Sequence, residues 1–104
     1  MLEWRSAMNL LIVDDEYLVV EEVVTVTDWE LLGITEIYSA TNAVSAVRIL
    51  NEKKIDIMIC DIEMPQTDGL ELSKKAKENF PDLEIVMLTS HAEFNYVRNA
   101  LRYG

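Results

Sequence analysis

Basic residues are scarce in this chain of 104 residues: nine lysines and arginines stand against nineteen aspartates and glutamates, for a net charge of -10. Gripping a nucleic-acid backbone needs a basic surface, so the charge balance argues against nucleic-acid binding by this segment. The single cysteine, Cys60, excludes an internal disulfide and fits a reducing compartment. No apolar run approaches the ~18 residues of a membrane-spanning helix, so no membrane span is predicted.

The length suits one small domain with one hydrophobic core. Residues 1–7 carry Glu3 and Arg5 and lack the apolar centre of a signal peptide. We therefore interpret 1–7 as an extraneous or disordered lead and place the domain at 8–104, with Met8 as its natural start.

Short apolar runs of strand length recur along the chain, at 9–13, 36–40, 55–60 and 83–88. Runs bounded by turn residues in this way are typical of strands buried on both faces. Helical patterns separate them, so the order is a repeated strand–helix alternation. This alternation predicts an α/β fold in which a parallel sheet has helices on both faces and right-handed crossovers.

The segment 16–27 has conflicting signals. Its β-branched residues favour a strand. A helical stripe formed by Val19, Val20, Val23, Val24 and Val26, with Glu21 and Glu22 together on the other side, favours a helix instead. We predict a helix that Asp14 or Asp15 caps and that ends before Trp29, which packs in the following loop.

The second and third helices have clearer patterns. Thr41 or Asn42 is the expected cap of the second, and Thr67 or Asp68 that of the third. The expected apolar side of the second helix consists of Ala43, Val44, Ala46, Val47 and Leu50, and that of the third of Leu72, Ala76 and Phe80. Ser90 is the expected cap of a fourth helix.

Polar side chains follow three of the predicted strands: Asp14 and Asp15, then Asp61, then Thr89 and Ser90. The carboxyl ends of adjacent parallel strands form the ligand-binding edge of such a sheet. Crowded carboxylates need a cation, and Mg²⁺ prefers oxygen ligands. A carboxylate beside a bound cation is also a plausible nucleophile toward a phosphoryl group. Taken alone, these acids are better explained by a helix start or a turn; only their joint placement favours a functional interpretation.

The chain resembles the receiver domain of bacterial two-component response regulators. The resemblance covers 8–104 and rests on Asp14-Asp15-Glu16 after Leu11-Ile-Val13, on Asp61-Ile-Glu-Met-Pro-Gln-Thr-Asp-Gly69 and on Val86-Met-Leu-Thr-Ser90. Asp28-Trp29, Leu32-Gly-Ile34 and Ser90-His-Ala-Glu-Phe94 are most similar to receivers attached to AraC-type DNA-binding domains. The resemblance to receiver domains implies a flavodoxin-like, doubly wound sheet with strand order 2-1-3-4.

The resemblance also implies a role for each matching residue. Asp61 would be the phosphoacceptor, taking a phosphoryl group from a sensor histidine kinase, with Mg²⁺ as cofactor. Asp15 would bind the metal directly and Asp14 mainly through water, while Asp61 and the backbone carbonyl of Glu63 complete the metal site. Thr89 would be the switch hydroxyl that contacts the phosphoryl group. The chain would act in the cytoplasm and would not be a turnover enzyme, and its parent would bind DNA through a separate output domain.

The chain departs from the family pattern at its C-terminal end. The fifth strand, the fifth helix and the lysine that pairs with the phosphoryl group would all lie beyond Gly104. We expect a receiver that is incomplete there, and a homodimer or an exchanged element as compensation for the exposed edge and apolar surface.

Two other classes of function are alternatives. A pseudo-receiver would act through protein contacts without phosphorylation. The intact set of acidic residues argues against it, while the missing lysine favours it. An enzyme of the haloacid-dehalogenase type would need an Asp-x-Asp motif, but Ile62 and Glu63 follow Asp61.

Overall fold

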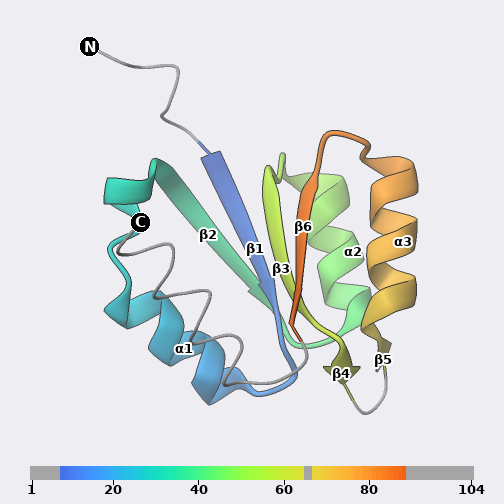
Figure 1. Cartoon of the computed structure of the whole chain (residues 1–104), viewed down its shortest axis with the longest axis horizontal. Helices are drawn as coiled ribbons and strands as arrows, with labels where there is room; N and C mark the ends of the chain where they lie inside the picture. Colours follow the sequence, from blue (N-terminus) through green and yellow to red (C-terminus); the bar gives the residue numbers. More distant parts are fainter. Residues whose placement is uncertain (1–7, 65–66, 89–104) are drawn as a thin grey trace.

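The computed structural model describes residues 8–64 and 67–88. Its centre is a sheet of four parallel strands in the order β2-β1-β3-β6 (Figure 1). These strands are β1 (Met8–Val13), β2 (Ile34–Ala40), β3 (Ile57–Asp61) and β6 (Glu84–Leu88). Counting these four in chain order gives 2-1-3-4, so the predicted flavodoxin-like, doubly wound topology is confirmed.

The two central strands are the most apolar because both of their faces are covered. In β1, Leu10, Leu11, Ile12 and Val13 are all fully or almost fully buried. Successive side chains point to opposite faces, so β1 contributes to two separate cores. Leu11 and Val13 belong to one core cluster, and Leu10 and Ile12 to the other.

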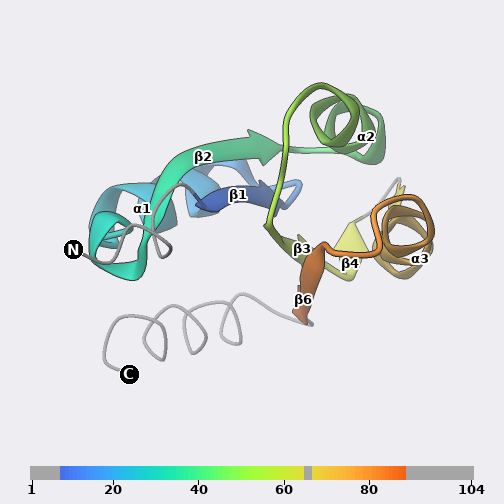
Figure 2. The same ribbon diagram turned by 90° about the horizontal axis from the view of Figure 1, so that it is seen from above.

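Helices cover both faces of the sheet. In Figure 2, α2 (Ala43–Glu52) and α3 (Gly69–Asn79) lie together on one side and α1 (Tyr17–Val26) on the other. A short 3-10 helix, η2 (Glu30–Leu32), follows α1. Trp29, only 6% exposed, packs at this corner as expected, and its indole Nε1–H donates to the carbonyl of Val24 at 3.2 Å.

The helix predicted over 16–27 is confirmed as α1, but its predicted cap is wrong. Glu16 occupies the N-cap position, and its side chain makes no capping hydrogen bond. Asp14 instead accepts a hydrogen bond from the backbone N–H of Glu16 at 2.9 Å, one residue before the helix begins. The carboxylate of Asp14 is therefore fixed next to the start of α1.

For α2 the predicted cap is confirmed, while part of its apolar side is not. Asn42 accepts a hydrogen bond from the N–H of Ser45 at 2.8 Å. Ala46 and Leu50 are buried, but Val44 is 72% exposed and Val47 44% exposed. These valines lie at the edge of the apolar stripe, where α2 faces α3 across an open groove.

The segment between β3 and α3 contains a pairing that the sequence did not predict. β4 (Glu63–Met64) and β5 (Thr67–Asp68) form a small antiparallel ladder, seen at the carboxyl end of the sheet in Figure 1. The capping predicted for Thr67 or Asp68, and the helix predicted after Ser90, lie outside what the structure describes. The stripe of α3 is confirmed, since Leu72 and Ala76 are buried and Phe80 is partly buried.

The strand predicted at 55–60 begins two residues later. Ile55 is buried, but Asp56 turns its carboxylate to the N–H of Asn9 at 2.7 Å, and the side chain of Asn9 donates to the carbonyl of Lys54 at 2.7 Å. These bonds join the starts of β1 and β3. Among the described residues, no helix has the length and apolarity needed to cross a membrane.

Candidate functional site

The first part of the site is the end of β1. The backbone N–H of Asp14 donates to the carbonyl of Ala40 at 3.1 Å, which ties this residue to β2. Its side chain is fully buried, and the bond from Glu16 fixes the carboxylate from the other side. The next residue, Asp15, is exposed. One carboxylate thus faces the protein and its neighbour faces solvent.

The second part is the end of β3. Asp61 is the last residue of the strand, lies in register with Leu88 of β6 and is 7% exposed. The N–H of Ile62 donates to the carbonyl of Leu88 at 2.9 Å, so β3 and β6 stay joined past the strand end. This keeps the turn that carries Asp61 in a defined place.

Gly69 makes a close approach that explains why a glycine stands at the start of α3. A Cβ at this position would overlap the backbone carbonyl oxygen of Asp61 and lie 3.0 Å from Cα of Ile62. Only a residue without a side chain lets α3 begin directly against the turn after β3. The sequence alone did not show this contact with the backbone of Asp61.

The structure brings the three predicted carboxylates together. One carboxylate oxygen from each of Asp14, Asp15 and Asp61 lies within 4.8 Å of the others. Oxygens around an ion at about 2.1 Å lie roughly 3 to 4 Å apart, so small side-chain movements would close the set on Mg²⁺. Oxygen donors with this much negative charge, two of them on buried residues, fit a hard divalent cation, and water molecules would complete its ligands.

The remaining predicted positions are less fully described. The backbone of Glu63 lies in β4, paired with Asp68, two residues after Asp61. Thr89 lies outside the described residues, although β6 ends at Leu88, directly before it.

Cys60 directly precedes Asp61 in β3, and its buried thiol is unreactive. Burial raises the pKa of its thiol to about 11; the hydrogen bond with Ser73 lowers it, while the negative charges of Asp61 and Asp14 add to the rise. The thiol donates to the backbone carbonyl of Asp61 at 3.5 Å. With this raised pKa, Cys60 stays protonated at neutral pH. Since the thiolate is the reactive and metal-binding form, we expect Cys60 to act as a core residue only.

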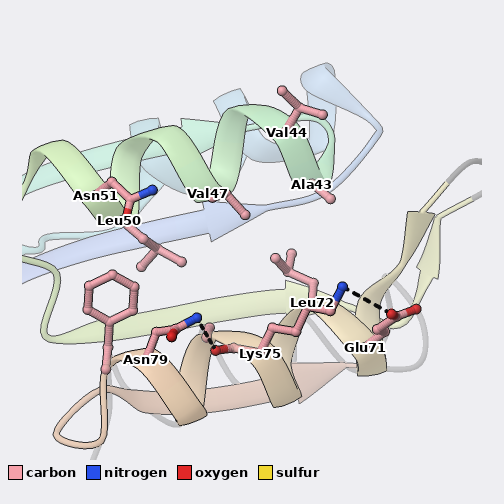
Figure 3. Close-up of a pocket in the computed structure, with 11 residues that line it drawn as sticks. Ala43, Val44, Val47, Leu50, Asn51, Glu71, Leu72, Lys75 and Asn79 are labelled. Carbon is pink, nitrogen blue, oxygen red and sulfur yellow. Dashed lines mark hydrogen bonds and ion pairs between the residues drawn. The ribbon is translucent and has the colours of Figure 1, made fainter.

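A separate groove of about 550 Å³ lies between α2 and α3 (Figure 3). It is lined by Ala43, Val44, Val47, Leu50, Asn51, Glu71, Leu72, Lys75, Ala76, Asn79 and Phe80. Its charged groups, Glu71 and Lys75, are paired with each other at 3.2 Å. Since none of the three aspartates lines it, the groove is not part of the acidic site.

Two of the relatives found by comparison with known proteins are transcriptional regulatory proteins of Bacillus subtilis. The chain is 35% identical over 96 residues to the uncharacterized transcriptional regulatory protein YesN of Bacillus subtilis strain 168, an alignment of 92% of this chain and 26% of YesN. It is 31% identical over 101 residues to the transcriptional regulatory protein MalR of the same organism, covering 93% of this chain and 41% of MalR. The chain thus spans less than half the length of these relatives.

Solved structures agree on the fold. A two-component transcriptional regulator AraC from Clostridium phytofermentans ISDg superposes with a TM-score of 0.76 at 26% identity, over 88% of this chain and 74% of that one. The receiver domain of AraT, a response regulator from Geobacillus stearothermophilus, gives a TM-score of 0.74 at 29% identity, over 91% and 74%.

The model of the response regulator receiver domain matches residues 10–104, which include both strand ends that carry the clustered aspartates. With these relatives and this fold, the chain belongs to the response regulator receiver family.

Proposed function

We propose that the chain is a phosphoacceptor module that takes a phosphoryl group from a sensor histidine kinase onto the carboxylate of Asp61 with Mg²⁺ bound. The observation that carries the proposal is the convergence of the Asp14, Asp15 and Asp61 carboxylates within 4.8 Å at the ends of two adjacent strands. Three carboxylates crowded together repel one another, and a bound divalent cation would offset that repulsion.

The chemistry is a transfer between two nucleophiles. A carboxylate oxygen of Asp61 forms a new bond to phosphorus as the bond to the donor's nitrogen breaks, and that nitrogen keeps the electron pair. Bound Mg²⁺ would neutralise charge on the transferring group. Asp15, exposed, and Asp14, buried, would hold the ion on the side of β1, and the carbonyl of Glu63 would do so after β3.

Burial of Asp61 also limits hydrolysis of the product. At 7% exposure the residue admits little water to the acyl phosphate that forms there. Thr89, which follows β6, would donate a hydrogen bond to the phosphoryl oxygens and so report the modification to the rest of the fold.

The wider role follows from the same proposal. The module would act in the cytoplasm and change its own surface rather than turn over a substrate. With a net charge of -10, this chain lacks the basic surface that DNA binding needs. DNA binding would therefore belong to a separate output domain of a longer parent protein.

The test is intact-mass analysis after incubation with acetyl phosphate and Mg²⁺. We expect a single phosphoryl adduct on the wild-type protein and none on Asp61→Asn. Asp82→Asn is the matched control, because Asp82 is exposed and precedes β6, at the opposite edge of the sheet. A folded wild-type protein that binds Mg²⁺ but gains no adduct would contradict the proposal and favour a phosphorylation-independent receiver.

A further inference from the structure

Ser73 is a polar residue buried in the apolar face of α3. It is 8% exposed and lies on the same side of the helix as Leu72 and Ala76. Its hydroxyl donates to the thioether sulfur of Met87 at 2.7 Å and lies close enough to the side chain of Cys60 to lower the pKa of that thiol. A buried hydroxyl is costly unless it is paired, and here its acceptor belongs to β6 while its other neighbour, Cys60, belongs to β3.

Those partners are themselves neighbours across the sheet. Cys60 of β3 and Met87 of β6 are in register, and the next pair along the ladder is Asp61 with Leu88. Ser73 therefore lies over the junction of β3 and β6, one residue before the end that carries the phosphoacceptor.

α3 makes a second contact with the same place. One turn before Ser73, Gly69 lies against the backbone carbonyl of Asp61, and that carbonyl also accepts the thiol of Cys60 at 3.5 Å. The start of α3 thus meets the ends of β3 and β6 at two points, through the close approach of Gly69 to Asp61 and through the hydrogen bond from Ser73 to Met87.

We propose that Ser73 is a positioning residue of the acidic site, which holds α3 to the Cys60–Met87 pair and thereby fixes the carboxylate of Asp61 relative to Asp14 and Asp15. This inference rests on the proposed function. Ser73 does not contact the carboxylates; it acts through the strand ends. A site whose groups must meet one phosphoryl group depends on supporting residues of this kind.

The test compares Ser73→Ala with Ser45→Ala, which removes a hydroxyl from a half-buried position in α2. Phosphoryl adduct is followed over time with acetyl phosphate at saturating Mg²⁺, at a temperature where circular dichroism shows each variant folded. We expect Ser73→Ala to slow adduct formation roughly three- to tenfold, because small misplacements of reacting groups are costly. Ser45→Ala should keep the wild-type rate.

Hydrogen exchange supplies a second measurement that needs neither Mg²⁺ nor a phosphodonor. The N–H of Ile62 bonds to the carbonyl of Leu88, so Ser73→Ala should speed its exchange while the amide of Leu11 in β1 stays protected. A residue that only stabilises the whole fold would change both amides alike.

Met87→Leu tests the same contact if Ser73→Ala fails to fold, because it removes the acceptor and keeps the core volume. It should slow adduct formation as Ser73→Ala does, and the double variant should be no slower than either single one. Wild-type rates in a folded Ser73→Ala or Met87→Leu protein would overturn the inference while leaving the proposed function standing. A wild-type protein without any adduct would overturn both.

Discussion

At the scale of single residues, two features beside the aspartates matter: the missing side chain of Gly69 and the retained proton of Cys60. Gly69 has no side chain where a Cβ would overlap the carbonyl of Asp61. Cys60 keeps its proton where a thiolate would compete for a cation. Each feature leads to a measurable consequence.

Gly69→Ala should destabilise the protein by about 1 to 3 kcal/mol, because the added methyl group forces the turn after β3 to move. Adduct formation at Asp61 should slow as well, since that turn carries the proposed phosphoacceptor. Urea unfolding measures the first effect and intact mass the second. Gly33→Ala is the control: Gly33 has φ 80°, so alanine there should cost about 1 kcal/mol from backbone strain and leave the rate of adduct formation unchanged. Equal rates in the two variants would contradict the role given to Gly69.

The thiol of Cys60 should make stability fall in alkaline solution. Burial raises its pKa from 9.0 to about 11 in the folded protein. Below pH 9 both states keep the proton and the contribution to stability is complete. From pH 9 to 11 the unfolded chain loses the proton first, which favours unfolding, and the full loss is about 2 to 3 kcal/mol at most.

Comparison with Cys60→Ala isolates this titration from those of tyrosine and lysine. Free energies of unfolding are measured in urea at pH 8 and pH 10 without divalent cations. The advantage of the wild type over the variant should shrink by roughly 1 kcal/mol at the higher pH. An advantage that stays constant would mean that Cys60 ionises normally in the folded state.

At the scale of the elements, α2 begins where Asn42 caps it. The side chain accepts the N–H of Ser45 at 2.8 Å, so Asn42→Ala should lower the free energy of unfolding by about 1 kcal/mol. Asn42→Ser keeps a capping oxygen and should cost much less. Urea unfolding of both variants is the measurement, and similar losses for the two would show that the cap contributes little.

The strands were predictable because a buried parallel strand is an uninterrupted apolar run. The ladder of β4 and β5 was not, since two-residue strands have no periodicity. Ile55 is buried whether it belongs to a strand or to the turn before it, so its apolar character could not show that β3 begins at Ile57. On α2, the sequence could not show that Val44 and Val47 face an open groove, because that depends on how far α3 lies from α2.

The site, like the fold, was predictable only in part. The three aspartates were predicted because topology alone brings the carboxyl ends of adjacent strands together. The role proposed for Ser73 was not predicted, because a lone serine in a helix is ordinarily read as a surface residue. Its position four residues after Gly69 and three before Ala76, on the apolar stripe, was the signal that could have revealed it.

At the scale of the whole molecule, negative charge is unevenly placed. α1 carries Glu21 and Glu22 with no basic residue, while α3 carries Lys74, Lys75 and Lys77. The acidic cluster lies beside the start of α1, within a chain of net charge -10. A divalent cation there would relieve repulsion both inside the cluster and across this half of the molecule.

The most direct test of the central claim, that these strand ends form one cation-dependent phosphoacceptor site, is a calorimetric titration with MgCl₂ at constant ionic strength. We expect one ion bound per chain, with affinity at least tenfold weaker in Asp15→Asn because a ligand is lost. Affinity should be unchanged in Asp82→Asn, which removes the same charge far from the site. Equal affinities in all three proteins, or no binding by a folded wild type, would contradict it.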